Sequence, residues 1–350
     1  MNKSRVQAMI QRASLDELMT LVDPGKVLTD AASLEAYGKD WTKHYPPAPS
    51  AIVLPRTVEQ VQAIVRWANA HKVALVPSGG RTGLSAGAVA AKGEVVVAFD
   101  YMNQILGFDA FDRTVVCQPG VITRQLQAYA EEQGLYYPVD FASSGSSQVG
   151  GNIGTNAGGI KVIRYGMTRN WVAGLKVVTG TGELLELNKG LVKNATGYDL
   201  RHLFIGAEGT LGFVVEATMR LDRAPRNLTA MVLGTPDFDS IMPVLHAFQG
   251  KLDLTAFEFF SDKGLARILA RGDVPAPFDT PCPFYALLEF EASTEQVADE
   301  ALATFEHCVA QGWVLDGVMS QSETQLKNLW KLREYLSETI SHWTPYKNDI

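Results

Sequence analysis

The sequence predicts an α+β protein built from two domains. Its 350 residues are more than one ordinary core accommodates. Apolar residues make up 46% and charged residues 20%, a composition typical of folded globular proteins. Short apolar strands and amphipathic helices follow one another, and the pattern breaks at residues 222–227, where Arg, Pro and Asn intervene. We therefore expect one domain at residues 1–225 and a second at 226–350.

In the first domain, apolar runs and capping residues predict the elements. Thr57 with Gln60 three residues later has the pattern of a capping box, and a helix with one apolar stripe follows. Thr123 can cap a second helix, which Gly134 would stop. Apolar runs predict strands at residues 51–55, 73–77, 94–99, 114–118 and 213–221, and a hairpin at 175–179 and 183–187.

In the second domain, strands and helices alternate with longer spacing. Apolar patterning predicts strands at residues 231–234, 256–260, 284–291 and 314–319, and helices at 238–248, 294–310 and 323–340. Two successive β-α-β-like units indicate an α+β sheet with helices on one face.

Charge and cysteine usage exclude several classes of protein. The net charge of −7 argues against a nucleic-acid-binding protein, which needs a surplus of Lys and Arg. Cys117, Cys282 and Cys308 are scattered without a CxxC pair, as expected for reduced thiols. The N-terminal region lacks the apolar core of a signal peptide, and no apolar run approaches the ~20 residues that cross a bilayer. We expect a cytoplasmic protein without a transmembrane segment.

The first candidate site is a glycine loop at residues 77–84, which read Pro-Ser-Gly-Gly-Arg-Thr-Gly-Leu directly after a predicted strand. Its glycines let backbone N–H groups converge on an anion such as a pyrophosphate, Ser78 and Thr82 add hydroxyl donors, and Arg81 adds charge. An ordinary glycine turn has the same local sequence. Neither GxGxxG nor GxxxxGK[ST] occurs in the chain.

A second, longer tract lies at residues 145–159 and holds six glycines in fifteen residues. Each glycine costs roughly 0.5–1 kcal/mol in unfolded-state entropy. A linker would also contain Pro, Lys and Glu, which are absent. These observations favour a loop that brings the backbone close to a ligand.

A third glycine-containing segment spans residues 194–200 and 204–212, where Glu208 and Thr210 lie beside glycines. A structural corner explains it equally well. The six histidines show no HxH or HExxH spacing, so the chain is not expected to hold a metal site of its own.

The order and spacing of these three segments resemble the FAD-binding domain of the vanillyl-alcohol-oxidase and p-cresol-methylhydroxylase (PCMH) superfamily, closest to its D-2-hydroxy-acid dehydrogenase branch. The resemblance implies a PCMH-type FAD-binding domain of two α+β subdomains, followed by an incomplete ferredoxin-like cap. Covalent members carry a histidine after the paired glycines, where this sequence has Arg81 and Thr82, so the FAD is expected to be non-covalent. The cofactor-binding residues implied by the resemblance are Pro77, Ser78, Gly79, Gly80, Arg81, Thr82, Gly83, Leu84, Pro119, Gly120, Ser144, Gly145, Ser147, Gly150, Gly151, Asn152, Thr155, Asn156, Gly158, Gly159, Tyr165, Gly166, Glu208, Gly209 and Thr210.

The resemblance also implies substrate-binding residues in the cap. Arg333 and Lys347 would bind substrate carboxylates, and Ser337 stands where some members have a threonine. A 2-hydroxy acid needs a cation for its carboxylate, and arginine offers a bidentate fork. Without the resemblance, Arg333 and Lys347 would be interpreted as solvated surface charges.

The activity implied is oxidation of a D-2-hydroxy acid to the 2-oxo acid, with D-2-hydroxyglutarate favoured by two anion-binding groups. The alternatives are D-lactate or glycolate, a flavin-binding fragment without turnover, and a sugar or alkyl-glycerone phosphate as substrate. Family members continue beyond the position of Ile350 into a segment with the catalytic base and the ligands of a divalent metal such as zinc, so the metal is expected only in a longer form. A separate electron acceptor, either an electron-transfer flavoprotein or a quinone, and possible homodimerisation complete the expectations.

Overall fold

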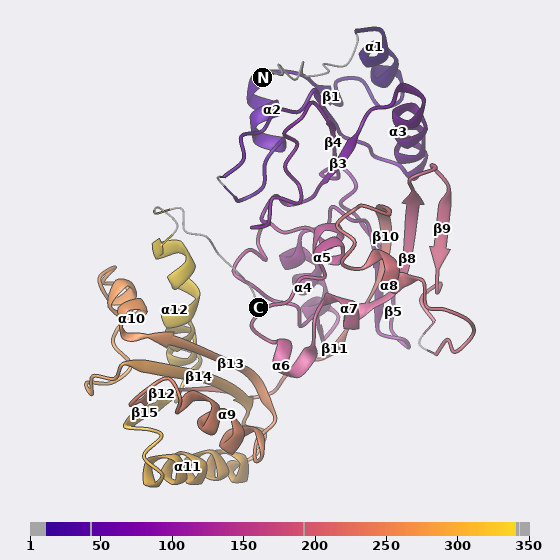
Figure 1. Ribbon diagram of the computed structural model, residues 1–350. Coiled ribbons are helices and arrows are strands. Elements are labelled where there is room, and N and C mark those ends of the chain that lie inside the picture. Colours follow the sequence, from indigo (N-terminus) through magenta and orange to yellow (C-terminus); the bar gives the residue numbers. More distant parts are fainter. Residues whose placement is uncertain (1–11, 43, 192, 341–342, 344–350) are drawn as a thin grey trace. The chain divides into compact units, whose positions relative to one another are not determined.

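The computed structural model (Figure 1) describes residues 12–42, 44–191, 193–340 and 343. The chain forms two compact units. Unit 1 comprises residues 1–157 and 167–223, and unit 2 comprises residues 158–166 and 224–350. The chain therefore passes between the units three times, and the short segment 158–166 belongs to unit 2 although the sequence on both sides of it belongs to unit 1.

Unit 1 begins with a four-stranded sheet in the order β1-β2-β4-β3, in which β2, β4 and β3 are parallel and β1 is antiparallel. Its elements are α1 (Arg12–Thr20), β1 (Val27–Leu28), α2 (Ala31–Tyr37), β2 (Ala51–Val53), α3 (Val58–His71), β3 (Leu75–Ser78) and β4 (Val95–Ala98). The predicted cap of α3 is confirmed, because Thr57 Oγ1 accepts the amide of Gln60 at 3.3 Å. The Gln60 side chain bonds the amide of Arg56, one residue earlier than in a capping box.

The second sheet of unit 1 is antiparallel, in the order β5-β6-β10-β8-β9. Short helices and β7 lie between its strands along the chain, and β7 pairs with β11, which comes directly after β10. The elements are β5 (Ile105–Asp109), β6 (Thr114–Cys117), α4 (Thr123–Glu132), β7 (Leu135–Tyr136), α5 (Val149–Thr155), α7 (Thr168–Trp171), β8 (Val172–Thr179), β9 (Leu184–Leu187), α8 (Arg201–Phe204), β10 (Gly212–Arg220) and β11 (Asp222–Arg223).

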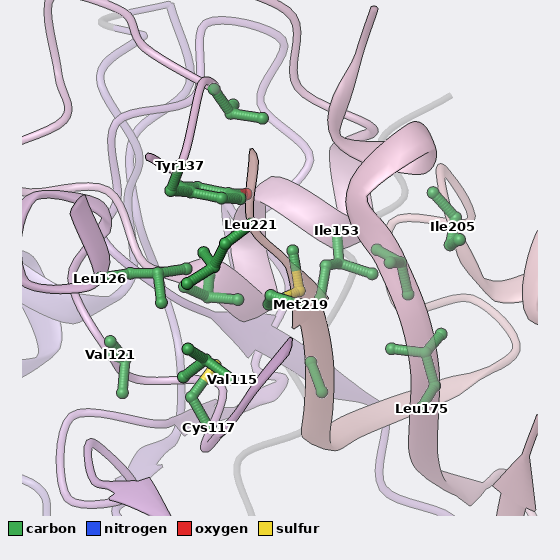
Figure 2. Close-up of a cluster of buried hydrophobic side chains, with 14 of the residues drawn as sticks. Val115, Cys117, Val121, Leu126, Tyr137, Ile153, Leu175, Ile205, Met219 and Leu221 are labelled. Carbon is green, nitrogen blue, oxygen red and sulfur yellow. The ribbon is translucent and has the colours of Figure 1, made fainter. Parts of the chain in front are cut away.

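A buried cluster joins α4 and α5 to this sheet, as Figure 2 shows. Leu126 of α4 and Ile153 of α5 lie beside strand residues such as Cys117 and Met219. Burial raises the pKa of the Cys117 thiol to about 12, so this cysteine is protonated at neutral pH and behaves as a core residue. A separate cluster packs α3 between the first sheet and residues of β8 and β10, which makes the two sheets of unit 1 one body.

Unit 2 is built on an antiparallel sheet in the order β13-β14-β12-β15, the order of a ferredoxin-like fold. Its elements are α6 (Val162–Tyr165), β12 (Leu228–Thr235), α9 (Ile241–Gln249), β13 (Leu254–Ser261), α10 (Asp262–Leu269), β14 (Phe284–Glu291), α11 (Glu295–Ala310), β15 (Asp316–Met319) and α12 (Glu323–Ile340).

The expectation of helices on one face of this sheet is wrong. The α9 and α11 helices pack on one face, and α10 and α12 pack on the other. The reason lies in β14, whose central residues are buried on both sides: Tyr285 and Leu287 face α10 and α12, whereas Ala286 and Leu288 face α9 and α11. A strand buried on both faces needs two covering layers.

Segment 158–166 joins unit 2 through a buried ion pair. Glu289 of β14, which is 1% exposed, accepts hydrogen bonds from Lys161 Nζ, from Thr255 Oγ1 at 2.5 Å and from Trp330 Nε1 at 2.7 Å. The Lys161 ammonium also lies 4.8 Å from the centre of the Trp330 ring. All three donors converge on one carboxylate, which is the condition for a buried charge to be tolerated.

We predict that Glu289→Leu strongly destabilises unit 2, because it leaves the Lys161 ammonium buried without a counter-charge. The expected loss in the free energy of unfolding is about 3–5 kcal/mol, measured by urea unfolding. The double variant Lys161→Met/Glu289→Leu should recover part of it, because an apolar pair has no charge to desolvate.

Asp253→Asn is the matched control for this prediction. It breaks the ion pair of Arg164 with Asp253, 3.1 Å long, whose carboxylate is 81% exposed. An exposed pair contributes less than about 1 kcal/mol. If Glu289→Leu cost no more than this control, the Lys161–Glu289 pair would not be what holds segment 158–166.

Candidate functional site

The loop at residues 77–84 leaves the carboxyl end of β3 in unit 1. Ser78 is fully buried at the end of the parallel ladder with β4, and Arg81 adopts a left-handed conformation with φ of 58°. Within the described residues, the backbone amides of residues 79–83 donate to no backbone or side-chain acceptor. A run of unpaired N–H groups of this kind is the basis of an anion-binding loop.

Arg81 was expected to offer its charge to a bound anion, and the structure gives its side chain other partners. Its guanidinium donates to both carboxylate oxygens of Asp100, at 3.0 and 3.3 Å, and to the carbonyl of Gly79 at 2.9 Å. It also lies 4.5 Å from the centre of the Tyr37 ring. Arg81 therefore fixes the shape of the loop, and the backbone amides carry the attraction for an anion. Asp100 and Tyr37 gave no signal in the sequence.

The glycine tract at residues 145–159 was expected to be a loop, and its central part is the helix α5. Gly150 persists in this helix because Pro119 approaches too closely for a side chain, whereas Gly151 and Gly154 have no such close neighbour. A Cβ on Gly150 would lie 2.5 Å from Cβ of Pro119, and a Cβ on Gly80 would lie 2.2 Å from the carbonyl oxygen of Ser146. The first loop is therefore packed directly on the tract.

The third segment, through its residues 204–212, contacts both the first loop and the glycine tract. Gly209 has φ of 77°, and a Cβ there would lie 2.4 Å from Cγ of Pro77. The amide of Glu208 donates to the carbonyl of Gly154 at 2.8 Å, and the amide of Gly206 donates to that of Ile153 at 3.0 Å. All three glycine segments thus meet in unit 1.

A buried polar network supports this junction. Thr123 was predicted to cap α4, but the N-cap is Ile122 and Thr123 is buried in the first turn. Its hydroxyl bonds Ser147 Oγ at 2.7 Å and accepts from Asn152 Nδ2 at 2.6 Å. The sequence did not reveal this role, because a threonine at the start of a helix gives the same local pattern whether it is the N-cap or a buried residue of the first turn.

Gln148 gives an independent indication of a ligand. Its Oε1 atom is buried, borders Gly79 and has no hydrogen-bond partner within the described residues. Leaving a buried acceptor unpaired costs free energy, and a donor on a bound ligand would remove that cost.

The other predicted cofactor residues are distributed over both units. Thr155 Oγ1 bonds the carbonyl of Gly151 at 3.0 Å, and Asn156 ends α5 in a left-handed conformation with φ of 49°. Thr210 Oγ1 bonds the carbonyl of Ala207 at 2.6 Å. Residues Gly83, Leu84, Ser144 and Gly145 lie on the loops flanking the junction, whereas Gly158, Gly159, Tyr165 and Gly166 belong to unit 2.

The residues on the two sides of segment 158–166 are hydrogen-bonded to each other within unit 1. The carbonyl of Ala157 accepts from the amide of Thr168 at 3.0 Å and from its hydroxyl at 2.8 Å. The amide of Arg169 donates to Asn156 Oδ1 at 3.0 Å. Segment 158–166, which contains Lys161, therefore leaves unit 1 after the end of α5 and returns to it just before α7.

Of the three predicted substrate-binding residues, one is fully described. Arg333 lies on α12, and its Nε donates to Glu258 Oε2 of β13 at 2.8 Å. Ser337 lies on the same helix, with its side chain outside the described residues, and Lys347 also lies outside them. In the described ranges, no three His, Cys, Asp or Glu residues are grouped to hold a metal ion. Nor does any helix there have the length and apolar character to cross a membrane.

Comparison with known proteins decides the family. Residues 49–188 match the FAD binding domain family, and residues 224–350 match the C-terminal domain of FAD linked oxidases. A D-2-hydroxyglutarate dehydrogenase of Stutzerimonas stutzeri (strain A1501) is 83% identical over 342 residues, which are 98% of this chain and 74% of the relative. The enzyme of the same name from Xanthomonas citri pv. viticola is 57% identical over 325 residues, which are 93% of this chain and 69% of the relative.

This chain belongs to the D-2-hydroxyglutarate dehydrogenase family. Its members are FAD-dependent oxidoreductases, as the sequence resemblance indicated. The mitochondrial enzyme of Danio rerio, 35% identical over 331 residues, matches 93% of this chain, which spans 62% of that relative's length.

Solved structures establish the fold of this family member as PCMH-type. An alkyldihydroxyacetonephosphate synthase superimposes with a TM-score of 0.75 at 20% identity, over 95% of this chain and 64% of that one. A p-cresol methylhydroxylase with substrate bound also gives a TM-score of 0.75, at 18% identity, over 95% of this chain and 73% of that one.

The junction of the three glycine segments fits FAD. Unpaired amides at residues 79–83 suit a pyrophosphate, glycines at 80, 150 and 209 permit close backbone packing, and Gln148 Oε1 offers a buried acceptor. Every one of these features lies within unit 1.

Gly80→Ala should weaken FAD binding and destabilise the loop, because its Cβ would meet the Ser146 backbone, which cannot move aside as a flexible side chain would. Overpacking of this kind costs about 1–3 kcal/mol. Fluorescence titration of the apoprotein with FAD and thermal melting measure the two effects. Gly107→Ala is the control, since nothing lies within 4 Å of a Cβ there. Equal FAD affinity in the two variants would contradict the close-packing argument.

Asp199 of the third segment supports a pH-dependent prediction. Its carboxylate accepts from Arg201 Nε at 2.8 Å and Nη2 at 2.5 Å, and these hydrogen bonds lower the pKa of Asp199 from 3.8. Arg201 is itself buried and donates to the carbonyls of Val172 and Ala173 at 2.7 and 2.6 Å.

A depressed folded-state pKa means that the stabilisation by Asp199 is present above its unfolded value near 3.8 and is lost as the pH falls through the folded value. Asp199→Asn should therefore lower the melting temperature at neutral pH, and the difference from wild type should shrink as the pH falls below 3.8. A difference independent of pH would show that the Asp199 charge is not involved.

Proposed function

We propose that this chain holds FAD without a covalent link and uses it to oxidise a D-2-hydroxy acid, with D-2-hydroxyglutarate as the preferred substrate. Unit 1 supplies the cofactor site and unit 2 supplies the groups that bind the substrate. The observation that carries the proposal is the chain's 83% identity to a D-2-hydroxyglutarate dehydrogenase over almost its full length. The geometry of the glycine junction and of Arg333 supports it.

Substrate binding is assigned to Arg333. Its side chain is one-third exposed, and among the described residues only its Nε is engaged, by Glu258, so the two Nη groups can receive a carboxylate in bidentate fashion. When bound, FAD supplies the acceptor for the hydride that leaves C2 of the hydroxy acid. Arg333 orients the acid through its carboxylate. Lys347 and Ser337 are proposed as further contacts on the strength of the sequence resemblance.

The non-covalent attachment is proposed from the sequence of the first loop. Neither Arg81 nor Thr82 has a ring nitrogen that could bond the flavin, and Arg81 is held by Asp100. Precipitating the holoprotein with acid should release the yellow cofactor into the supernatant. Colour that stays with the pellet would overturn this part of the proposal.

Four expectations from the sequence remain predictions: a separate electron acceptor, possible homodimerisation, a cytoplasmic location, and a divalent metal such as zinc in a longer form.

The FAD-loaded chain should lose its flavin absorbance under anaerobic conditions on addition of D-2-hydroxyglutarate, and lose it more slowly with D-lactate or glycolate. Arg333→Gln should raise the acid concentration for half-maximal reduction ~10–100-fold, because one bidentate charged contact is lost. Stopped-flow absorbance measures both effects. A preference for D-lactate would overturn the substrate assignment, and flavin left oxidised by all three acids would favour a flavin-binding chain without turnover.

A further inference from the structure

The α12 helix is attached to the sheet of unit 2 at two points on one face. Trp330 Nε1 donates to Glu289 Oε2 of β14 at 2.7 Å, and Arg333 Nε donates to Glu258 Oε2 of the neighbouring strand β13 at 2.8 Å. Residues three apart lie on the same side of a helix, so both donors point toward the sheet. The two carboxylates therefore fix both the register of α12 and the orientation of its arginine.

Glu258 accepts a hydrogen bond from only one of the three nitrogen atoms of the Arg333 guanidinium. A guanidinium has five N–H donors in one plane, and Glu258 takes only the Nε–H. The two Nη groups donate to no acceptor in the part of the chain that the structure describes. Arg333 is 33% exposed and Glu258 is 20% exposed, so the pair is partly accessible to a ligand.

We propose that Glu258 is a positioning residue for the substrate, acting through Arg333. By accepting the Nε–H, it holds the guanidinium plane so that the two Nη groups meet a carboxylate of the acid together. This inference rests on the proposed role of Arg333 in substrate binding, and it adds Glu258 as a second determinant of affinity.

Glu258 exerts two effects of opposite sign on the bound acid. Its hydrogen bond orients Arg333, which strengthens binding by reducing the rotamer freedom lost when the substrate arrives. Its negative charge repels the substrate carboxylate, which weakens binding. A carboxylate that does not orient Arg333 would give only the second effect.

Two substitutions of similar size separate these effects. Glu258→Gln and Glu258→Leu both remove the charge, but only glutamine keeps an oxygen that accepts the Nε–H of Arg333. We expect the glutamine variant to bind D-2-hydroxyglutarate about three- to tenfold more tightly than wild type. The leucine variant should bind about tenfold more weakly than the glutamine variant.

The experiment is calorimetric titration of the FAD-loaded 350-residue chain with D-2-hydroxyglutarate. The same pair of substitutions at Glu338 is the matched control. Glu338 lies on α12 and pairs with Arg271 at 3.0 Å, but its carboxylate is 70% exposed and Arg333 is not its partner. Both control variants should bind the acid as wild type does. Circular dichroism and FAD content verify folding, and Glu258→Ala replaces Glu258→Leu if the latter does not fold.

The Arg333→Gln background tests whether Glu258 acts through the arginine. In that background, the glutamine and leucine substitutions at Glu258 should give the same affinity, because there is no guanidinium to orient. Equal affinities of the two Glu258 variants in the wild-type background would overturn the inference.

Failure of the underlying function gives a different pattern. If Arg333→Gln binds the acid as tightly as wild type, or if wild type does not bind it, the proposed role of Arg333 is wrong and the role of Glu258 falls with it. If Arg333→Gln weakens binding while the Glu258 variants remain equal, only the positioning role is wrong.

Discussion

An ammonium group removed from water needs a counter-charge, and Lys161 has Glu289 as its partner in the interior of unit 2. The rest of unit 2 is organised around this pair. Thr255 and Trp330 supply the other donors to Glu289, and Trp330 in turn fixes α12, the helix that carries Arg333. Lys161 belongs to segment 158–166, whose neighbours along the chain on both sides lie in unit 1.

Such a pair contributes more to specificity of structure than to net stability, because the cost of desolvating two ions offsets most of their attraction. Its value here is geometric. It selects one position for segment 158–166 among those that an apolar contact would allow, and it places the indole of Trp330 against the same carboxylate.

The cofactor site depends on a different constraint, the removal of side chains. Gly80, Gly150 and Gly209 each face a neighbour that a Cβ would meet at 2.5 Å or less. Three segments far apart in sequence can therefore share one small volume and leave the amides of residues 79–83 without an acceptor among the described residues. The entropic cost of glycine in the unfolded chain is the consequence of this packing.

Much of the fold was predictable where the signal is local. The α12 and β14 bounds agree with their apolar periods, Thr57 caps α3 as its spacing predicts, and the glycine segments, through their family resemblance, identified the FAD fold. Local composition could not show that residues 149–155 form a helix, since glycines oppose helix formation and the close approach of Pro119 to Gly150 appears only in the tertiary structure. Nor could it assign α10 and α12 to a second face of the sheet.

The sequence by itself therefore determined most of the local elements, the two-domain α+β class and the residue types available for FAD and a carboxylate. Only the tertiary structure decided the partners of the charges. Lys161 and Glu289 are 128 residues apart, and Arg333 and Glu258 are 75 apart. No periodicity or spacing links positions so distant, because their pairing follows from the sheet order that brings β13 and β14 together under α12.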